Sequence, residues 1–461
     1  MTCLRGVDAT IEWQRFSGRY ELHPGYVEAV ETLTITFLGR GMVLSSESLD
    51  PMPNLTHIRF ESSERQVNWS YDGETLRWTY DPPLLDGDTF TYTRRWVENL
   101  SAGPSGLRTL VVPLRPTSEA SLAFTTKGVD ITYSNLPLSA DGSYSGPVNV
   151  EGCVVRYGTT YKLFTYRWRG TIQNMGARPA KVALNVSIPW DGQFQHVLSD
   201  PEGIIMQDRL GNRWYHVEET VPQGGSRDVE VEVRALTQTW PDGFQVNMSI
   251  AREGLLRPDA DYWQSEDPRI QQFALGLANG TSDRLDQIRA LTLGVHRYLN
   301  YSIEPGRMGA LWALVNGRGA CMEYTDLFVA AARSLGIPAL YVSGVCGASS
   351  VEGFGHAWAI AELSNGTWIG TDPTSGYVGR LDSGRLLLQF CNPADVGASL
   401  RCTRGVARID SWSRTWEYRE LSEEEAHRIL GIAEQPLAAF TICVFLLAIL
   451  STRRPLNRAS F

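Results

Sequence analysis

The chain has 461 residues, which on length alone predicts about three domains. Hydrophobic residues make up 43% and charged residues 20%, ordinary fractions for a globular protein that buries a sizeable core. The formal net charge of −9 argues against nucleic acid as a partner. The sequence also contains 14 Trp and 18 Tyr, many of them in alternating runs, which favours extensive β-sheet.

Residues 1–145 are predicted to form a β-sandwich-like domain. Side chains at 30–37 alternate almost strictly between apolar and polar, and those at 89–97 alternate again. The runs 66–71 and 75–80 flank an Asp-Gly-Glu sequence, which is typical of a hairpin turn. Several short strands at this spacing indicate a sandwich. No group of residues in this part suggests catalysis.

Residues 146–250 are predicted to form a second β-sandwich-like domain. The runs 161–172 and 181–189 have strand character and are separated by Gly and Pro. His196 and His216 have no acidic or thiol partner nearby in the sequence. We therefore expect these two histidines to be structural.

Within residues 251–420, helices are predicted first and strands after them. Asp267 is placed to cap a helix that starts at the following proline and ends near residue 280. Thr281 or Ser282 is expected to cap the next helix. The buried face of that helix is predicted to be Leu285, Ile288, Leu291, Thr292, Val295, Tyr298 and Leu299. Helices followed by a sheet predict an α+β fold.

A further helix is predicted to begin at Cys321. Gly317 and Gly319 allow the backbone in front of it to turn tightly. Apolar residues then recur on one helical face at Tyr324, Leu327, Phe328, Ala331 and Leu335. Gly336 is placed to end the helix, and Pro338 prevents its continuation. At the first helical turn, the free N–H groups and the helix dipole favour the thiolate form of Cys321.

His356 and Asp372 follow on two predicted strands. His356 lies in an alternating run, and the next strand, after an Asn-Gly turn, ends at Asp372. Adjacent strands can bring the two side chains together, and a helix that packs across the sheet can bring Cys321 to them. Each residue taken singly has a structural explanation. Jointly they predict a nucleophile, a base and a group that orients the base.

Four short motifs occur in order around these residues: Gly319-Ala320-Cys321, Arg333-Ser334-Leu335-Gly336-Ile337-Pro338, Gly355-His356-Ala357-Trp358 and Thr371-Asp372-Pro373-Thr374. Over residues 280–380 the chain resembles the transglutaminase-like superfamily. The resemblance implies a papain-like core in which Cys321 is the nucleophile, His356 the base and Asp372 the orienting group. The preceding β region is similar to the one often found before bacterial transglutaminase-like cores.

The expected chemistry is attack of the thiolate on an amide carbonyl, which leaves a thioester. The backbone N–H of Cys321 is one candidate oxyanion donor, with Tyr301 or Trp312 as the second. Glu323 and Asp326 are expected to stabilise the helix start. An amine would resolve the thioester by acyl transfer and water by hydrolysis.

Three functions remain open. The first is an acyltransferase that acts on protein glutamine or peptide amide groups. The second is a cysteine protease or amidase with the same triad. The third is a non-enzymatic, membrane-anchored surface protein with a vestigial thiol domain. No cofactor or metal is expected, because the sequence has neither a Cys/His pattern typical of zinc nor an EF-hand loop.

Residues 421–461 are predicted to anchor the chain in a membrane. A charged helix at 421–435 begins with a capping box formed by Ser422 and Glu425. The uncharged run that follows gives a transmembrane helix at 436–452, and the tail at 453–461 is basic. The positive-inside rule places this tail in the cytoplasm and the catalytic part outside it. The alternative is a buried C-terminal helix.

Other features bear on the compartment. The N-x-S/T pattern occurs at Asn54, Asn68, Asn99, Asn185, Asn247, Asn279, Asn300 and Asn365, which favours a glycosylated surface protein. Residues 1–19 lack the apolar core of a signal peptide, so either the true start lies upstream or the bulk of the chain is cytoplasmic. Cys391 and Cys402 are close enough in sequence to pair in an oxidising compartment. Cys153 and Cys346 are expected to be buried thiols.

Overall fold

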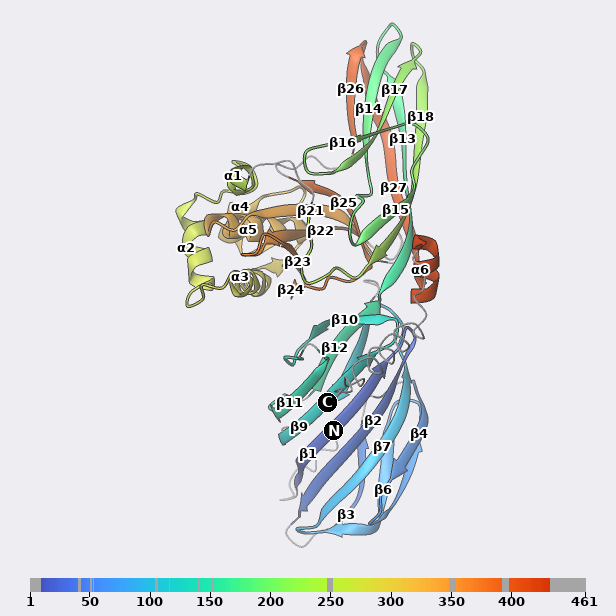
Figure 1. The fold of residues 1–461 in the computed structure, drawn as a ribbon, viewed down its shortest axis with the longest axis vertical. Coiled ribbons are helices and arrows are strands. Elements are labelled where there is room, and N and C mark those ends of the chain that lie inside the picture. Colours follow the sequence, from blue (N-terminus) through green and yellow to red (C-terminus); the bar gives the residue numbers. More distant parts are fainter. Residues whose placement is uncertain are drawn as a thin grey trace, which may run out of the picture.

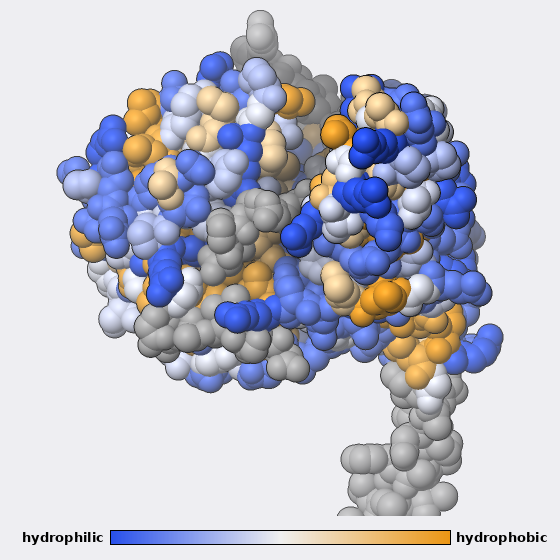
Figure 2. Space-filling view, turned by 90° about the horizontal axis from the view of Figure 1, so that it is seen from above, coloured by the Kyte–Doolittle hydropathy of each residue, from blue (hydrophilic) through white to orange (hydrophobic). Residues whose placement is uncertain are grey.

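The computed structural model describes residues 10–39, 43–49, 52, 54–103, 107–115, 117–139, 141–150, 152–246, 252–347, 354–391 and 398–431. Figure 1 shows an N-terminal sandwich at one end of the long axis and a second β unit at the other. A helix–sheet unit, residues 252–391, lies beside the second β unit. Figure 2 shows a mainly hydrophilic surface on the face seen from above, with small scattered hydrophobic patches.

The N-terminal sandwich is built from one large sheet and two small ones. The large sheet has the order β11 (Ser143–Val148), β9 (Thr117–Thr126), β1 (Thr10–Leu22), β2 (Tyr26–Leu38), β7 (Thr89–Asn99) and β4 (Leu55–Glu61). The small sheets are β3 (Val43–Leu49), β6 (Leu76–Leu85) and β5 (Gln66–Tyr71), and β10 (Val129–Ser134), β12 (Gly152–Thr159) and β8 (Arg108–Pro113).

The predicted alternation is confirmed in β2, where every second side chain is buried from Val27 to Phe37. The predicted end of this domain at residue 145 is too early. Strand β12 pairs with both β8 and β10, so the sandwich continues to Thr159. The sequence does not show this because Gly152–Thr159 reads equally well as the first strand of a new domain.

Two four-stranded sheets form the second β unit. One has the order β15 (Gln195–Ser199), β18 (Ser226–Gln238), β13 (Tyr161–Asn174) and β27 (Ala407–Leu421). The other is β16 (Ile204–Gln207), β17 (Arg213–Val221), β14 (Ala180–Ile188) and β26 (Ala398–Arg404). Their facing side chains share one hydrophobic core, in which Phe164, Trp168 and Val186 are fully or almost fully buried.

The predicted catalytic unit 251–420 extends too far, because it includes strands β26 and β27. They pair antiparallel with β14 and β13 and therefore belong to the second β unit. Without them β13 and β14 would each have an unpaired edge, and the backbone groups of an open edge need partners. The sequence analysis did not separate these strands from the catalytic unit, because a short stretch does not specify which distant strand it meets.

The helix–sheet unit contains α1 (Arg252–Leu256), α2 (Pro268–Leu277), α3 (Arg284–Tyr298), α4 (Ala310–Asn316) and α5 (Cys321–Ser334). Its antiparallel sheet has the order β24 (Tyr377–Val378), β23 (Trp368–Asp372), β22 (Phe354–Glu362), β21 (Ala339–Cys346) and β25 (Arg385–Cys391). Two short strands, β19 (Asn300–Tyr301) and β20 (Arg318–Gly319), pair in front of α5. Helix α5 shares a core with small sheet residues such as Ala357 and Ala359.

Both faces of this sheet are covered, which explains its nearly continuous burial. The helices lie on one face, where Ala361 of β22 contributes to their core. On the other face Trp358 and Ile360 pack with Trp240, from the segment after β18. The sheet is therefore fixed between the helices and the second β unit.

The predicted helix ends are mostly confirmed. The Asp267 side chain accepts from the Arg269 N–H at 2.9 Å at the start of α2. Helix α3 begins at Arg284, so its cap is Asp283 rather than Thr281 or Ser282, and the Asp283 side chain accepts from the Asp286 N–H at 3.0 Å. Gly336 follows the end of α5 with φ of +73°.

The charged helix near the end of the described chain is α6 (Glu423–Leu430). Ser422 and Glu425 form its predicted capping box. In the part of the chain that the structure describes, no helix has the length and apolar character needed to cross a membrane. The predicted span 436–452 and the basic tail 453–461 lie outside the described residues.

Candidate active site

Cys321 is the first residue of α5, and buried Glu323 holds the chain in front of it. One carboxylate oxygen of Glu323 accepts from the Ala320 N–H at 2.9 Å, and the other accepts from the Met308 N–H at 2.9 Å. The Glu323 side chain is wholly inaccessible to solvent. Its predicted role at the helix start is therefore extended, because it also fixes the loop beside the sulfur.

Asp326, one turn further along α5, is equally buried. It accepts from Trp263 Nε1 at 2.8 Å and from Arg307 Nε at 2.9 Å. The Arg307 guanidinium lies 4.1 Å from the ring centroids of Tyr262 and Tyr341. Burial raises the pKa of Asp326 to about 6, against the lowering effect of Arg307. These contacts fix the first two turns of the helix.

His356 and Asp372 meet as the sequence predicts. His356 Nε2 lies 2.9 Å from Asp372 Oδ2, and both side chains are almost completely buried. Asp372 Oδ1 accepts from the Thr374 N–H at 3.0 Å, and Ser375 Oγ donates to Oδ2 at 3.1 Å. The His356 ring also stacks on Trp358, with centroids 5.9 Å apart. The carboxylate and the imidazole are each held in one orientation.

A third charged residue that the sequence did not indicate joins this pair. Arg385 Nη1 lies 2.8 Å from Asp372 Oδ2, and its Nε lies 3.1 Å from Asp382 Oδ2. Arg385 begins β25, which reaches β22 only through β21. No local motif marks it, because its position depends on strand order alone.

The charges around His356 determine its protonation. Burial lowers the pKa of His356, but the Asp372 carboxylate raises it by charge and by hydrogen bonding. The Cys321 side chain raises it further, Arg385 lowers it, and the resulting pKa is about 9. Burial favours neutral Asp372, yet His356 and Arg385 hold its pKa below the usual range. At neutral pH the pair is therefore imidazolium and carboxylate.

Cys321 completes the arrangement from the start of α5. With Nε2 on Asp372, Nδ1 is the ring nitrogen left for the thiol, and this atom makes no conventional hydrogen bond within the described structure. Cys321 is half-buried and therefore reachable. Of the three residues that the sequence predicted, the structure pairs His356 with Asp372, and the Cys321 side chain contributes to the raised pKa of His356. A proton can pass from the sulfur to Nδ1 while Asp372 holds the opposite nitrogen.

Residues 271–373 match the family model of the Transglutaminase-like superfamily. The chain carries a transglutaminase-like domain. The matched residues contain the helix that begins at Cys321, the strand of His356 and Asp372 itself. The resemblance inferred from the four short motifs is confirmed.

Several solved structures are similar to parts of the chain. The "Putative Cysteine Protease from Cytophaga hutchinsonii" is 18% identical with a TM-score of 0.43, covering 57% of this chain and 92% of that one. The periplasmic domain of TgpA from Pseudomonas aeruginosa is 15% identical with a TM-score of 0.28, covering 47% and 91%. An M1 zinc metallopeptidase from Deinococcus radiodurans is 14% identical with a TM-score of 0.23, covering 34% and 43%. These TM-scores carry no inference about activity. No curated protein matches the chain.

Several other cysteines are more deeply buried than Cys321 of the transglutaminase-like domain. Cys346 and Cys153 are buried, as predicted, and burial raises their pKa to about 12 and about 11. The suggested bridge between Cys391 and Cys402 is not formed. Cys402 Sγ instead contacts the backbone of Ala407 in the second β unit, whereas Cys391 lies in the core of the helix–sheet unit.

The two candidates for a second oxyanion donor differ in their surroundings. Tyr301, on β19, is 59% exposed, and its pKa is raised by partial burial and by an interaction with Cys321. Trp312 packs its ring against the Arg318 guanidinium, 5.7 Å from the ring centroid. Of the two, Tyr301 is therefore the one whose pKa responds to Cys321.

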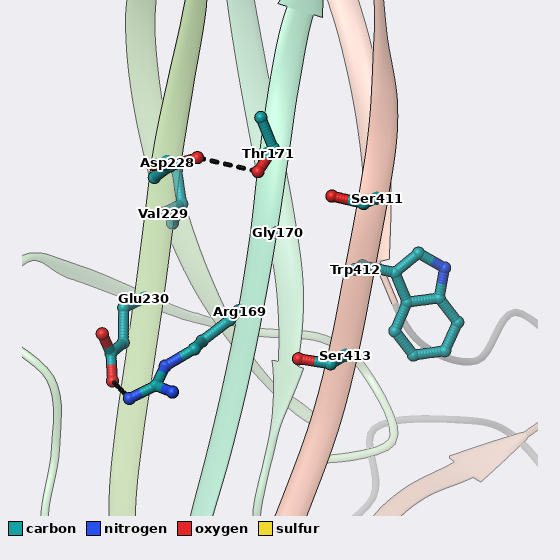
Figure 3. Close-up of a pocket in the computed structure, with 9 residues that line it drawn as sticks. All are labelled: Arg169, Gly170, Thr171, Asp228, Val229, Glu230, Ser411, Trp412 and Ser413. Atoms are coloured by element: carbon teal, nitrogen blue, oxygen red, sulfur yellow. Dashed lines mark hydrogen bonds and ion pairs between the residues drawn. The ribbon is translucent and has the colours of Figure 1, made fainter.

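Two cavities in the described structure are lined by residues other than the triad. One of about 580 Å³ lies over the sheet of β18, β13 and β27 (Figure 3), where Trp412 points away from β13. Another, of about 300 Å³, lies between the second β unit and the transglutaminase-like domain. Arg414 of β27 lines it, and a Cβ on Gly355 would be 2.8 Å from its Nη2. The second β unit therefore reaches the residue next to His356.

Proposed function

We propose that this chain is a cysteine enzyme that acts on amide groups of proteins or peptides by thiol-mediated acyl transfer. One observation carries the proposal: Asp372 holds Nε2 of the buried His356 imidazole, and Cys321 at a helix start helps to raise the pKa of that ring. The match of residues 271–373 to the transglutaminase-like model supports the same chemistry.

The first half-reaction forms a thioester. Cys321 gives its proton to His356 Nδ1, and the thiolate is stabilised by the imidazolium and by the N-terminus of α5. The sulfur attacks the amide carbonyl, and the C–N bond breaks as His356 returns the proton to the leaving amine or ammonia. Removing one oxyanion donor typically costs about 2.7–4 kcal/mol of barrier, and the Cys321 N–H is placed to act as such a donor.

The second half-reaction determines the product. Transfer to a primary amine gives a new amide, whereas water gives a carboxylic acid and makes the enzyme a protease or amidase. His356 serves both routes, because it removes a proton from the attacking amine or water and returns it to the sulfur. We propose transfer as the main outcome, with a protein or peptide as acyl donor.

The test uses glutamine-containing peptides with and without a labelled primary amine. Transfer predicts incorporation of the label and release of ammonia, both abolished in Cys321→Ala. Peptide cleavage or deamidation without incorporation would replace transfer by hydrolysis. If neither product forms, and if Cys321 is alkylated by iodoacetamide no faster than an ordinary thiol at neutral pH, the domain is a non-enzymatic module.

We also propose that segment 436–452 anchors the protein in a membrane with the catalytic part outside the cytoplasm. The support is its apolar sequence, the basic residues after it and the frequency of N-x-S/T sites. Protease added to intact cells should then digest the bulk of the chain and spare the tail. Protection of the bulk would favour a cytoplasmic location.

A further inference from the structure

Arg385 is a buried cation held between two carboxylates. Its side chain is 4% exposed, and it contacts Asp372 at 2.8 Å and Asp382 at 3.1 Å. The guanidinium also lies 5.7 Å from the centroid of the Trp358 ring, on which His356 stacks. A cation this deeply buried needs such partners, and here one of them belongs to the triad.

The contact with Asp372 is made at the oxygen that His356 uses. Oδ2 is 2.9 Å from His356 Nε2 and 2.8 Å from Arg385 Nη1, so one oxygen faces two cations whenever the imidazole is charged. The charge of Asp372 is therefore shared. Because Arg385 stays charged at all working pH values, it limits how strongly the carboxylate stabilises the imidazolium.

The segment before Arg385 is fixed by both β units. Ser383 Oγ donates to the Thr159 carbonyl at the end of the N-terminal sandwich. Thr237 Oγ1, in the second β unit, donates to the Ser383 carbonyl at 2.6 Å. Asp382 Oδ1 in turn accepts from the Gly384 N–H at 2.9 Å. The guanidinium thus reaches the triad from a junction of all three parts of the molecule.

We propose that Arg385 is a positioning residue of the triad, which fixes the Asp372 carboxylate and moderates the basicity of His356. The inference rests on the function proposed above. An imidazolium that binds its proton too tightly is a poor acid toward a leaving amine, and a carboxylate without Arg385 is freer to turn toward its other hydrogen-bond donors. Arg385 limits both effects.

The charged and titratable groups around His356 and Arg385 come from several elements. They are Cys321 on α5, Asp372 on β23, Asp382 before β25, Cys346 on β21, Lys162 on β13 and Arg414 on β27. Arg385 itself contacts Asp372 directly, at 2.8 Å. Its removal is therefore expected to change the triad directly.

The experiment measures the rate of iodoacetamide alkylation at Cys321 from acid to alkaline pH, by mass spectrometry of the Cys321 peptide in the full chain. In wild-type protein the alkylation rate should be constant over the pH range in which Cys321 and His356 form an ion pair. It should change where the imidazolium loses its proton, which defines the alkaline limb of the profile. In Arg385→Met and Arg385→Gln this alkaline limb should move to higher pH by about one unit or more. Arg385→Lys should keep the wild-type limb.

Loss of position is tested separately from loss of charge. Lysine keeps the cation but not the planar fork that contacts two carboxylates, so Arg385→Lys should react about tenfold more slowly at neutral pH. If both neutral variants fail to fold, the comparison of Arg385→Lys with wild type tests the proposal. An alkylation rate of Arg385→Lys equal to that of wild type would then overturn it. If the neutral variants fold and keep the wild-type limb, the proposal is equally overturned.

The two proposals fail in different ways. A wild-type Cys321 without ion-pair reactivity removes the proposed function. Wild-type ion-pair reactivity that is unchanged in every Arg385 variant leaves the function in place and removes only the role of Arg385. Arg380→Met is a matched control, because this exposed arginine, nearby in the sequence, pairs with Asp130 instead. It should leave the alkylation profile unchanged.

Discussion

At His356, burial and charge act in opposite directions. A buried imidazole favours its neutral form, but the carboxylate 2.9 Å away reverses this and raises the pKa from 6.5 to about 9. The imidazolium is thereby the resting form at neutral pH, which suits a thiolate partner better than a thiol. The same charge makes folding depend on pH.

The first prediction concerns stability at alkaline pH. Because the folded-state pKa of His356 is raised from 6.5 to about 9, its charge stabilises the fold by about 3 kcal/mol below pH 6.5. That contribution is lost as pH rises through about 9. The free energy of unfolding in urea should fall across this interval, and His356→Gln should flatten the fall. An equally steep fall in His356→Gln would assign it to other groups.

The second prediction concerns Asp372. Asparagine keeps the shape but loses the charge, so the pKa of His356 falls and the imidazole can adopt the wrong tautomer. Turnover of the best peptide substrate should drop by about 10²–10⁴-fold, and neutral-pH alkylation of Cys321 should slow with it. Asp286→Asn on the exposed start of α3 serves as the control. A variant of Asp372 with normal alkylation would show that the carboxylate is not needed for the ion pair.

At the scale of the element, α5 owes its position to carboxylates that the sequence suggested only as helix stabilisers. Glu323 joins the turn before Cys321 to the Met308 backbone, and Asp326 joins the next turn to Trp263 and Arg307. Both side chains are inaccessible to solvent. These contacts therefore help to position the sulfur through the helix.

The third prediction tests this attachment. Glu323→Ala leaves the N–H groups of Ala320 and Met308 without acceptors in a buried place, at a cost of about 1–3 kcal/mol each. Chemical unfolding should show that loss, with a smaller one in Glu323→Gln, which keeps one acceptor oxygen. Glu424→Ala is the matched control, because Glu424 also lies in the first turn of a helix but is exposed. Similar losses in both alanine variants would refute the role of Glu323.

At the scale of the whole molecule, the chain returns to its middle part after the transglutaminase-like domain. Strands β27 and β26 form one edge of each of the two sheets of the second β unit. Arg108 of the N-terminal sandwich pairs with Glu420 on β27 at 2.8 Å. The three parts are thus connected through one late segment. That arrangement also places Arg414 beside Gly355.

The fourth prediction follows from this return. A chain that ends at residue 391 lacks β26 and β27 and exposes the edges of β13 and β14, which then favour aggregation. A chain that ends at residue 431 keeps them and should be monomeric. Size-exclusion chromatography and circular dichroism distinguish the two. A soluble, folded 1–391 with wild-type alkylation of Cys321 would show that the transglutaminase-like domain does not need the late strands.

The sequence by itself determined many local elements and identified Cys321, His356 and Asp372 as candidates for a triad. Alternation marked the strands, capping signals marked α2 and α6, and a glycine-flanked cysteine before an amphipathic run marked the start of α5. These features depend on side chains within a few residues of one another. The transglutaminase-like domain and the pairing of His356 with Asp372 were also predictable, because the motifs around these residues occur in order at a recognisable spacing.

Only the tertiary structure decided the rest. The role of β12 in the first sandwich, the return of β26 and β27 and the ion pair of Arg385 with Asp372 depend on which strands become neighbours. Pairing is determined by the burial of whole faces and by backbone edges that need partners, and neither is encoded in a short stretch. Residues far apart in sequence therefore obtain their charged partners only through the pairing of strands into sheets.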